Sequence, residues 1–464
     1  MPGSKVTLKG FNLPELGKCQ RGKVRDSYSL GNGTRLIVTT DRQSAFDRVL
    51  AEIPYKGAVL NQLSAFWFEQ TKDIIPNHLI EVIDPHAVIV KDMTPFRVEV
   101  VVRGYLSGVT TTSAWYAYER GEREFCGNTM PDGMKKNQAF PTPLITPTTK
   151  SDTGHDMRIS PKEVVEQGLV PAKQWKIIAD AALNIFARGQ EIARKSGLIL
   201  VDTKYEFGED QDGNVFLIDE VHTPDSSRYW IATNYEERFK NSEEPDYLDK
   251  EFLRIWLKQQ GFMGDGPMPE IPEEFINRMA DVYISTYEKL TGKQIERTTV
   301  SPRDRLINTL RERGIVKGAL VEVMLGSDSD KDFCAKMLSE LEHWPVAVNL
   351  FVGSAHKNTL KVFDHIRELN AADEPVVFIT VAGRSNALSG VVAANSIHPV
   401  IACPPHKDKD DYLVNIHSSL QMPSQTPVMT VCDPVNAALA AVRMIGFTNP
   451  AIVEKNRQEL ANRT

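Results

Sequence analysis

The stretch VDTKYEFGEDQDGNVFLIDEVHTPDSSRYW, Val201–Trp230, predicts a central β-hairpin in the first half of the chain. Side chains alternate between the two faces of an extended strand, so Asp202, Lys204 and Glu206 share one face. The turn EDQDGN separates this strand from the returning run VFLIDEV. The hairpin therefore carries a row of charged side chains, and its strand pairing decides what that row can hold.

The position of Asp219 depends on how the two strands of this hairpin pair. If Gly208 pairs with Val215, Asp219 falls on the same face as Lys204, and Glu206 is its diagonal neighbour. Diagonal neighbours lie about 7–8 Å apart, close enough for two carboxylates to share a bound Mg²⁺. A pairing shifted by one residue would turn Asp219 away. The alternative interpretation is an exposed hairpin face with a cross-strand salt bridge.

Length and composition indicate a globular protein with more than one domain. The chain has 464 residues, too many for a single hydrophobic core, so two or three domains are expected. Its formal net charge of −7 offers no basic surface for nucleic acid. The five cysteines form no CxxC pair, so we expect reduced thiols in a cytoplasmic protein. No apolar run is long enough to predict a membrane span.

Local patterns predict several elements of the first half. The Gly31–Gly33 turn between DSYSL and TRLIVTT predicts a hairpin. Apolar residues at helical spacing predict a helix over Lys173–Ser196 and another near Glu273–Leu290. A polar run and a short helix then lead into the second half, and we place the domain joint within 295–317.

The second half of the chain has a different sequence pattern. Five short apolar, β-branched runs follow one another: ALVEVML, PVAVNLFV, PVVFITVA, HPVIAC and TPVMTVC. Helical patterns separate them, over Lys331–Glu342, Thr359–Asn370, Leu388–Asn395 and Asn436–Ile445. This alternation predicts an α/β domain with a parallel sheet and helices on both faces.

Small polar residues follow the first three predicted strands of the second half. The loops read GSDSD (326–330), GSAHK (353–357) and AGRSN (382–386). Parallel strands end at one edge of their sheet, and helix N-termini at that edge suit a phosphate. Lys357 and Arg384 add positive charge, and His356 is a candidate for proton transfer. One such loop is more often a plain turn, but three together indicate a site for a phosphorylated small molecule.

These loops resemble the 5-aminoimidazole ribonucleotide (AIR) carboxylase family. The matching runs are GSDSD (326–330), SAHK (354–357), AGRSN (382–386) and PVIACPP (399–405), and the resemblance covers about 318–448. It implies a three-layer, flavodoxin-like α/β fold and a homo-octamer. It also implies that His356, Lys357 and Ser385 are catalytic. The substrate-binding residues that it implies are Ser327, Asp330, Ser354, Arg384 and Asn386.

Two forms of that family share the fold. One moves a carboxyl group from N5-carboxylated AIR, and the other takes CO2 directly; SAHK, AGRSN and CPP resemble the CO2-using form. The chain has no biotin-type AMKM motif, so we expect carboxylation without biotin. The alternatives are the mutase form, a nucleotide-binding scaffold without activity, and a small-molecule kinase joined to a flavin-binding module.

The first half resembles the SAICAR synthetase family, the phosphoribosylaminoimidazole-succinocarboxamide synthases, over about 15–293. The matching runs are GKVRD (22–26), TDRQSAFD (40–47), KGAVLNQLSAFWF (56–68), EVVVRGYLSG (99–108), TPTTKSDTGHD (146–156), VDTKYEFG (201–208) and DEVHTPDSSRYW (219–230). The resemblance implies an ATP-grasp or kinase-like α+β fold. No GxxxxGK[ST] run occurs, which excludes a Walker-type phosphate loop.

The same resemblance implies three sets of site residues. ATP is contacted by Lys23, Lys204 and Glu206, and Mg²⁺ is held by Glu206 and Asp219. The residues implied for the phosphorylated imidazole substrate are Asp41, Ser44, Arg103, Ser107, Asp225 and Arg228. The segment between Ser107 and Trp115 is longer than in the family, which leaves open whether Ser107 or Ser113 contacts the substrate.

Together the two resemblances imply a bifunctional enzyme of purine synthesis, a lyase and a ligase. The second domain would carboxylate AIR with CO2 to CAIR. The first would join CAIR to L-aspartate with ATP and Mg²⁺, giving SAICAR through an acyl phosphate. The expected domains are 1–296 and 318–464, with 297–317 as a linker. We expect small-molecule substrates only, with neither nucleic acid nor membrane as a partner.

Overall fold

The computed structural model describes residues 7–45, 48–150, 157–249, 251–262, 266–298 and 300–462. The runs 40–47 and 146–156, which contribute to the family resemblance, lie partly outside these described residues. By internal contacts the chain divides into two compact units. The first unit holds the chain up to Gly10 and Gln20–Pro302, and the second holds Phe11–Cys19 and the chain from Arg303 onward. The domain limits expected from the sequence stay a prediction.

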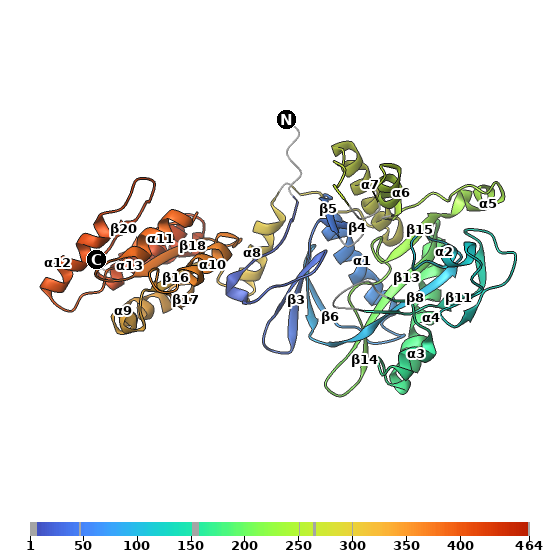
Figure 1. The fold of residues 1–464 in the computed structure, drawn as a ribbon, viewed down its shortest axis with the longest axis horizontal. Coiled ribbons are helices and arrows are strands. Elements are labelled where there is room, and N and C mark those ends of the chain that lie inside the picture. Colours follow the sequence, from blue (N-terminus) through green and yellow to red (C-terminus); the bar gives the residue numbers. More distant parts are fainter. Residues whose placement is uncertain are drawn as a thin grey trace. The chain divides into compact units, whose positions relative to one another are not determined.

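Two antiparallel sheets form the frame of the first unit, which has an α+β fold (Figure 1). The first sheet has the order β1-β2-β3-β7-β6, from β1 (Gln20–Arg21), β2 (Arg25–Ser29), β3 (Thr34–Thr39), β6 (Leu79–Asp84) and β7 (Ala87–Lys91). The second has the order β11-β8-β13-β14, from β8 (Thr94–Tyr105), β11 (Ala139–Ile145), β13 (Leu198–Glu209) and β14 (Val215–Ile218). In addition, β12 (Thr148–Thr149) pairs with β8 and β15 (Ser227–Ile231) pairs with β13.

Short strand pairs and helices complete the first unit. The pairs are β4 (Arg42–Ala45) with β5 (Arg48–Glu52) and β9 (Glu124–Phe125) with β10 (Asn128–Thr129). The helices are α1 (Lys56–Thr71), α2 (Ala114–Glu119), α3 (Pro161–Glu166), α4 (Ala172–Lys195), α5 (Ala232–Lys240), α6 (Glu251–Gln259) and α7 (Glu273–Thr291). The β2–β3 hairpin, α4 and α7 confirm the elements that the sequence predicted there.

A large apolar core packs α1, α4 and α7 together with β8 and β13, and smaller apolar clusters form around α2 and around β15 and α5. Helix α4 buries Ile178, Ile185 and Phe186 because they recur at helical spacing, and Gly197 follows the helix with a left-handed φ of 73°. Tyr205 points into the same core from β13, since alternation separates it from its charged neighbours. The charged face of β13 therefore lies opposite the core.

The second unit is the expected flavodoxin-like α/β fold. Its five strands are parallel in the order β17-β16-β18-β19-β20. They are β16 (Leu320–Leu325), β17 (Ala347–Val352), β18 (Val376–Val381), β19 (Val400–Ala402) and β20 (Met429–Thr430). This order places β16 between β17 and β18, so the loops that follow these three strands are neighbours at one sheet edge.

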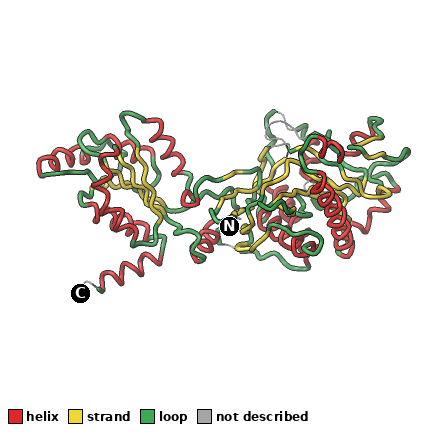
Figure 2. Tube along the Cα trace, turned by 90° about the horizontal axis from the view of Figure 1, so that it is seen from below, coloured by secondary structure: helices red, strands yellow, loops and turns green. Residues whose placement is uncertain are grey.

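Helices cover both faces of this sheet, which Figure 2 shows as strands between helices. One apolar layer packs α9 (Lys331–Glu342) and α13 (Pro434–Gly446) on one face, and another packs α10 (Thr359–Asn370) and α11 (Ala387–Asn395) on the other. The remaining helices are α8 (Pro302–Glu312), α12 (Lys409–Leu420) and α14 (Pro450–Ala461). The sequence analysis did not predict α12 and α14. None of the helices in the described ranges combines the length and hydrophobicity needed to cross a bilayer.

The segment Phe11–Cys19 is part of the second unit, although its sequence neighbours belong to the first. Asn12 donates its backbone N–H to Asp373 Oδ2 at 2.6 Å, and Glu15 donates its own to Glu374 Oε1 at 3.2 Å. In return, Glu15 accepts from the backbone of Lys317 at 2.6 Å. These contacts bury Glu374, whose side chain lies in a carboxylate-rich surrounding.

Replacing Glu374 with glutamine is expected to stabilise the second unit at pH 8. Burial, together with the carboxylates of Glu15 and Asp373, raises the pKa of Glu374 from 4.5 to about 7. A raised carboxyl pKa favours the folded state below pH 4.5, and this stability is lost as the pH rises through 7. Glutamine removes that loss, worth about 2–3 kcal/mol. Calorimetry at pH 5 and pH 8 measures it, with exposed Glu368→Gln as the control; equal pH slopes in both variants would contradict it.

Candidate functional site

The strand pairing around β13 differs by one residue from the pairing considered above. Gly208 pairs with Phe216 instead of Val215, so β14 ends at Ile218 opposite Glu206. In a regular strand this shift would turn Asp219 away from the charged face. Asp219 instead adopts a left-handed φ of 63° directly after the strand, and its Oδ2 lies 3.8 Å from Lys204 Nζ. A backbone turn therefore brings Asp219 to the charged row, where the register alone would not.

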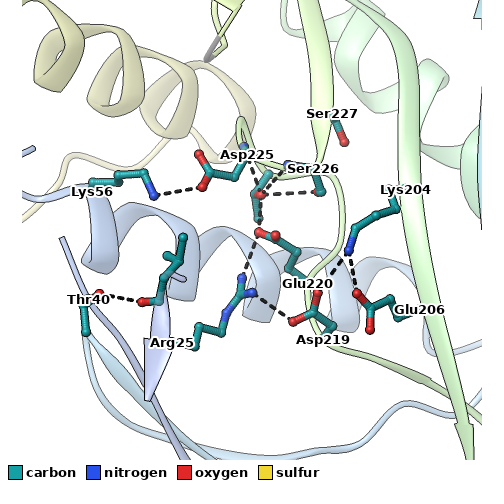
Figure 3. A network of polar contacts seen from close by, with 12 residues as sticks. Arg25, Thr40, Lys56, Lys204, Glu206, Asp219, Glu220, Asp225, Ser226 and Ser227 are labelled. Carbon is teal, nitrogen blue, oxygen red and sulfur yellow. Dashed lines mark hydrogen bonds and ion pairs between the residues drawn. The ribbon is translucent and has the colours of Figure 1, made fainter. Parts of the chain in front are cut away.

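Charged side chains from β2, β8, β13 and the turn after β14 meet around Lys204. Figure 3 shows four of them: Arg25, Glu206, Asp219 and Glu220. Its Nζ lies 3.0 Å from Glu99 Oε1 on β8 and 2.5 Å from Glu206 Oε1 on β13. Arg25 of β2 continues the network, with 2.8 Å contacts to Asp219 Oδ1 and to Glu220 Oε2. We call these six residues, with Lys150, the carboxylate cluster; Lys150 contacts Glu206 at its other carboxylate oxygen, Oε2.

Burial and charge set the protonation of this cluster. Burial opposes ionisation of Glu206, but the ammonium groups of Lys204 and Lys150 outweigh it and lower the pKa of Glu206. Burial, with the charge of Glu206, outweighs Arg25 and raises the pKa of Asp219 from 3.8 to about 6. At neutral pH both carboxylates are therefore anionic, and Asp219 is the first to take up a proton as the pH falls.

The donor set of the carboxylate cluster fits the expected Mg²⁺. The described residues contain no group of three or more His, Cys, Asp or Glu side chains able to hold a metal ion. However, Mg²⁺ in phosphoryl-transfer sites is commonly held by one or two carboxylates, with water and phosphate oxygens as further ligands. Glu206 and Asp219 both contact one cationic group, the Lys204 ammonium. Their oxygens therefore already face a common point of positive charge.

Arg42 shapes the turn that carries Lys23. Its guanidinium donates to the carbonyl oxygens of Gly22 at 3.0 Å and Lys23 at 3.2 Å. It also pairs with both carboxylate oxygens of Asp26, at 2.7 and 3.1 Å. Lys23 itself is exposed at the tip of this turn, and Arg25 at its end reaches the carboxylate cluster. The GKVRD run thus forms a rigid turn with a cation at each side.

Beside the carboxylate cluster lies a polar cavity of about 240 Å³. It is lined from β8, β13, β15 and the segments around 110–113 and 225–228: Val101, Arg103, Thr110, Thr112, Ser113, Asp202, Thr203, Lys204, Asp225, Ser226, Ser227, Arg228, Asp249 and Arg254. Asp202 stands between two of the cations, 2.5 Å from Arg228 Nη1 and 3.6 Å from Arg103 Nη1. Lys204 both lines this cavity and belongs to the carboxylate cluster.

The cavity lining contains Ser113 and does not contain Ser107. Ser107 is buried and donates to Asn137 Oδ1 at 3.0 Å. Ser113 donates to the carbonyl of Thr110 at 2.6 Å. Between them, Gly108 has a φ of 94°, and an added Cβ would lie 2.6 Å from the Ser113 side chain. Glycine at this position therefore lets the longer segment fold back so that Ser113 reaches the cavity.

Two fully buried side chains, those of Lys56 and Tyr283, bind the carboxylate of Asp225. Its Oδ2 accepts from Lys56 Nζ at 2.8 Å, and its Oδ1 accepts from the Tyr283 hydroxyl at 2.5 Å. Lys56 also donates to the carbonyl of Arg42 at 3.1 Å. The two oxygens of Asp225 are thus engaged within the protein, and the carboxylate anchors the loop that carries Arg228.

Replacing Lys56 with methionine is expected to destabilise the first unit by about 3–5 kcal/mol, because it leaves the buried Asp225 carboxylate without its cation. Urea denaturation of the full chain measures the change. The matched control is Lys72→Met, just after the same helix, where an exposed pair with Glu69 contributes less than about 0.5 kcal/mol. Equal stability of the two variants would show that the buried pair is not required.

Besides Ser107, two further residues predicted to bind the substrate lie away from the cavity lining. Asp41 is buried, and its carboxylate accepts from the backbone N–H of Leu8 at 2.7 Å and of Gly57 at 2.8 Å, at the start of α1. Ser44 lies on β4 opposite Val49. In this structure Asp41 therefore holds the start of α1 and the segment at Leu8 in place. A substrate contact for Asp41 or Ser44 stays a prediction.

In the second unit the three loops meet at the carboxyl edge of the sheet, as the strand order requires. Ser327 accepts from the backbone of Ser329 at 3.3 Å and thereby caps the turn that includes Asp330. Burial raises the pKa of Asp330. Ser354 accepts from the backbone of Lys357 at 3.3 Å, which leaves the side chains of His356 and Lys357 exposed at the loop surface.

The third loop combines exposed and buried side chains. Arg384 and Ser385 are exposed, and Arg384 has a left-handed φ of 52° with its N–H donated to Asn415 of α12 at 2.5 Å. Asn386 is buried instead, and its amide bonds to Ser389 at 2.8 Å and Ser419 at 2.9 Å. Asn386 thus caps α11, and its predicted contact with the substrate stays untested.

Several residues of the carboxylate cluster and cavity were not singled out from the sequence. Glu99 had a signal, because alternation in EVVVRG places it on the same strand face as Arg103. Arg25 and Glu220 lie within quoted runs but carried no assigned role. Lys56 had no local signal, since its partner Asp225 is 169 residues away.

Comparisons with known proteins give the same division. A family profile described as SAICAR synthetase matches residues 18–269, and one described as AIR carboxylase matches residues 320–464. The phosphoribosylaminoimidazole-succinocarboxamide synthase of Legionella pneumophila (strain Lens) is 52% identical over 287 residues, 62% of this chain and 91% of that protein. The chloroplastic synthase of the same name from Arabidopsis thaliana is 48% identical over 285 residues, 61% of this chain and 69% of that protein.

A solved structure supports the fold of the first unit. The SAICAR synthase from Saccharomyces cerevisiae, complexed with SAICAR, is 33% identical with a TM-score of 0.54. The match covers 62% of this chain and all of that chain, 100%. The chain therefore belongs to the SAICAR synthetase family through its first unit, and residues 320–464 add a unit of the AIR carboxylase family.

Proposed function

We propose that the chain catalyses two consecutive steps of purine synthesis. The second unit carboxylates AIR with CO2 to CAIR, and the first unit joins CAIR to L-aspartate at the expense of ATP to give SAICAR. The single observation that supports the ligation best is the shared position of Lys204. It lines the cavity with Arg103 and Arg228 and also contacts Glu206 in the carboxylate cluster.

The two sides of Lys204 suit the two reactants of phosphoryl transfer. On the cavity side, Arg103 and Arg228 match the planar geometry of carboxylate and phosphate groups, so this side would bind CAIR. Ser113 and Thr112 would add hydrogen bonds there. On the cluster side, Glu206 and Asp219 would hold Mg²⁺, which supplies charge stabilisation to ATP phosphates. The exposed Lys23 turn and Arg25 would face those phosphates.

The ligation then proceeds in two steps. An oxygen of the CAIR carboxylate attacks the γ-phosphorus of ATP, the bond to the β-phosphate oxygen breaks, and an acyl phosphate and ADP result. The amine of L-aspartate attacks the acyl carbon, loses a proton, and expels phosphate as the amide forms. In this scheme Lys204 would stabilise the negative charge that spreads during the first step, and Arg103 and Arg228 would keep the carboxylate oriented.

The carboxylation would use the three loops of the second unit. Lys357 and Arg384 would hold the phosphate of AIR at the helix N-termini of the sheet edge. The nucleophilic imidazole carbon attacks CO2, a carbon–carbon bond forms, and His356 takes up the proton that this carbon loses. Ser385 would orient CO2. The runs SAHK, AGRSN and CPP, which resemble the CO2-using form of the family, support CO2 over the N5-carboxylated substrate.

One assay series with the full chain tests both activities. AIR with bicarbonate and without ATP should yield CAIR, and addition of ATP, Mg²⁺ and L-aspartate should then yield SAICAR. If only N5-carboxylated AIR yields CAIR, the second unit is the mutase. If added CAIR does not yield SAICAR, the ligase assignment fails. A yellow pure protein would indicate the flavin-binding alternative instead.

The assembly proposed here comes from the family resemblance, and the proposed location comes from the cysteine pattern. We propose a homo-octamer through the second unit, consistent with the exposed apolar side chains of Val348 and Leu350 on its edge strand β17. Light scattering of the full chain tests the octamer. We propose a cytoplasmic location, although the plant relative carries a chloroplastic name. Fractionation of the source cells tests that location.

A further inference from the structure

A charged side chain lies at the centre of an apolar layer in the second unit. Glu322, in the middle of β16, is fully buried. Its neighbours on the same strand face are Leu320 and Met324, and Phe378 of β18 belongs to the same apolar layer. Burying a carboxylate in such a layer is costly unless it is paired. The residues that bond to Glu322 therefore indicate which role a carboxylate has at this position.

Those partners come from the two elements that flank one of the proposed catalytic loops. Asn349 of β17 donates its side-chain amide to both oxygens of Glu322, at 2.9 and 3.1 Å. His365 of α10 places its Nε2 2.7 Å from Oε1 of the same carboxylate. Residues 353–358 connect β17 to α10 and carry His356 and Lys357. One buried carboxylate thus connects the strand and the helix that flank this loop.

A second set of contacts runs from His365 to the start of the loop. The imidazole of His365 stacks on the ring of Phe351, with centroids 3.9 Å apart and planes 4° from parallel. Phe351 lies directly under Gly353, where an added Cβ would come within 2.4 Å of its ring. Lys361 of α10 donates to the carbonyl of Val352 at 3.0 Å. These contacts therefore fix the position of Gly353, the first residue of the loop, relative to the sheet.

The loop between these anchors is bonded to itself. Asn358 accepts from the backbone of Ser354 at 2.6 Å, and its own N–H returns to the Ser354 carbonyl at 3.0 Å. Thr359 donates its hydroxyl to the Ala355 carbonyl at 2.6 Å. A loop held in this way moves as one piece, so a shift of its anchors is passed on to His356 and Lys357.

We propose that Glu322, Asn349 and His365 are positioning residues, which set the place of His356 and Lys357 for the reaction of the second unit. The inference rests on the proposed carboxylase function. None of these three residues is proposed to contact the substrate. A displacement of about 1 Å at a reacting group lowers turnover by as much as about 100-fold, so a tie beneath the loop has a measurable effect.

The test separates positioning from stability with a pair of substitutions. Either Glu322→Leu or His365→Phe alone breaks the tie and lowers the melting temperature. The double variant E322L/H365F replaces the buried pair by apolar groups and is expected to regain most of that stability, while phenylalanine keeps a ring on Phe351. We expect its turnover number for carboxylation to stay about 10–100-fold below the parent, with KM for AIR changed less than about threefold.

Controls within the same chain sharpen the result. Ligation of added CAIR should be unchanged in every variant. The substitution H343F, which replaces an exposed histidine after α9, should leave carboxylation unchanged. Recovery of the full turnover number together with stability in E322L/H365F would overturn the proposal. If the parent converts neither AIR nor N5-carboxylated AIR, the proposed function fails. The inference is then judged by NMR: unchanged imidazole signals of His356 in the double variant overturn it, and shifted signals support it.

Discussion

Ligation of CAIR is expected to fall about 10²–10³-fold when Glu206 is replaced by glutamine, while carboxylation of AIR stays unchanged. The amide keeps the size of the side chain and a hydrogen bond to Lys204, but it removes the charge that Lys204 and Lys150 hold in place. It also removes half of the proposed carboxylate pair for Mg²⁺. Initial rates with added CAIR, at several Mg²⁺ concentrations, measure the effect.

The matched control for this substitution lies on the same strand. Glu209→Gln, at the end of β13, changes a carboxylate that accepts from Gln174 outside the cluster, and ligation should remain near the parent rate. The expected signature of Glu206→Gln is a higher Mg²⁺ requirement in addition to the lower rate. Ordinary turnover at ordinary Mg²⁺ would remove Glu206 from the proposed metal site.

Replacing His356 with asparagine is expected to lower carboxylation about 10²–10⁴-fold and to leave ligation of added CAIR unchanged. Asparagine retains polarity at the exposed loop surface but cannot take up the proton that the imidazole carbon loses. Stability should not change, because His356 is exposed and its loop is held by backbone and Ser354 contacts. Lys357→Ala is expected to impair carboxylation as well, through weaker binding of the AIR phosphate.

The control for His356 is His343→Asn, which changes an exposed histidine at the end of α9. Carboxylation should be measured with both AIR plus bicarbonate and N5-carboxylated AIR, so that the result does not depend on which of the two substrates the second unit uses. Parent-like turnover of both substrates by the His356→Asn variant would place the proton transfer on another residue.

The fold of the second unit could be predicted from the sequence almost element by element. Its strands are short β-branched runs bounded by helical patterns, a signal that depends only on neighbouring residues. Helices α12 and α14 were missed. For the first unit, alternation correctly placed Lys204 and Glu206 on one face of β13. What local pattern could not supply was the pairing of β13 with β14.

The pairing was wrong by one residue because local pattern does not fix where the turn between the two strands closes, here with Asp210 bonded to Asn214. Nor does the sequence show which backbone conformation Asp219 adopts after β14. A left-handed aspartate costs free energy by itself, and only surrounding contacts such as the Arg25 ion pair hold it there. Long-range partners limit site prediction in the same way. Lys56 looks like an ordinary helix-start lysine until the fold brings Asp225 to it. Motif residues were accessible to sequence reasoning, whereas the residues that orient them were not.

The return of Phe11–Cys19 to the second unit has a consequence for how the polypeptide can be divided and made. A protease cut or gene truncation after Pro302 would leave this segment with the wrong fragment and uncover the carboxylates of Asp373 and Glu374. During translation the segment leaves the ribosome well before its partner, because Asn12 pairs with Asp373, which is 361 residues later in the chain. The second unit therefore cannot be completed until the whole of the first unit has been synthesised, and Phe11–Cys19 stay without their partner until then.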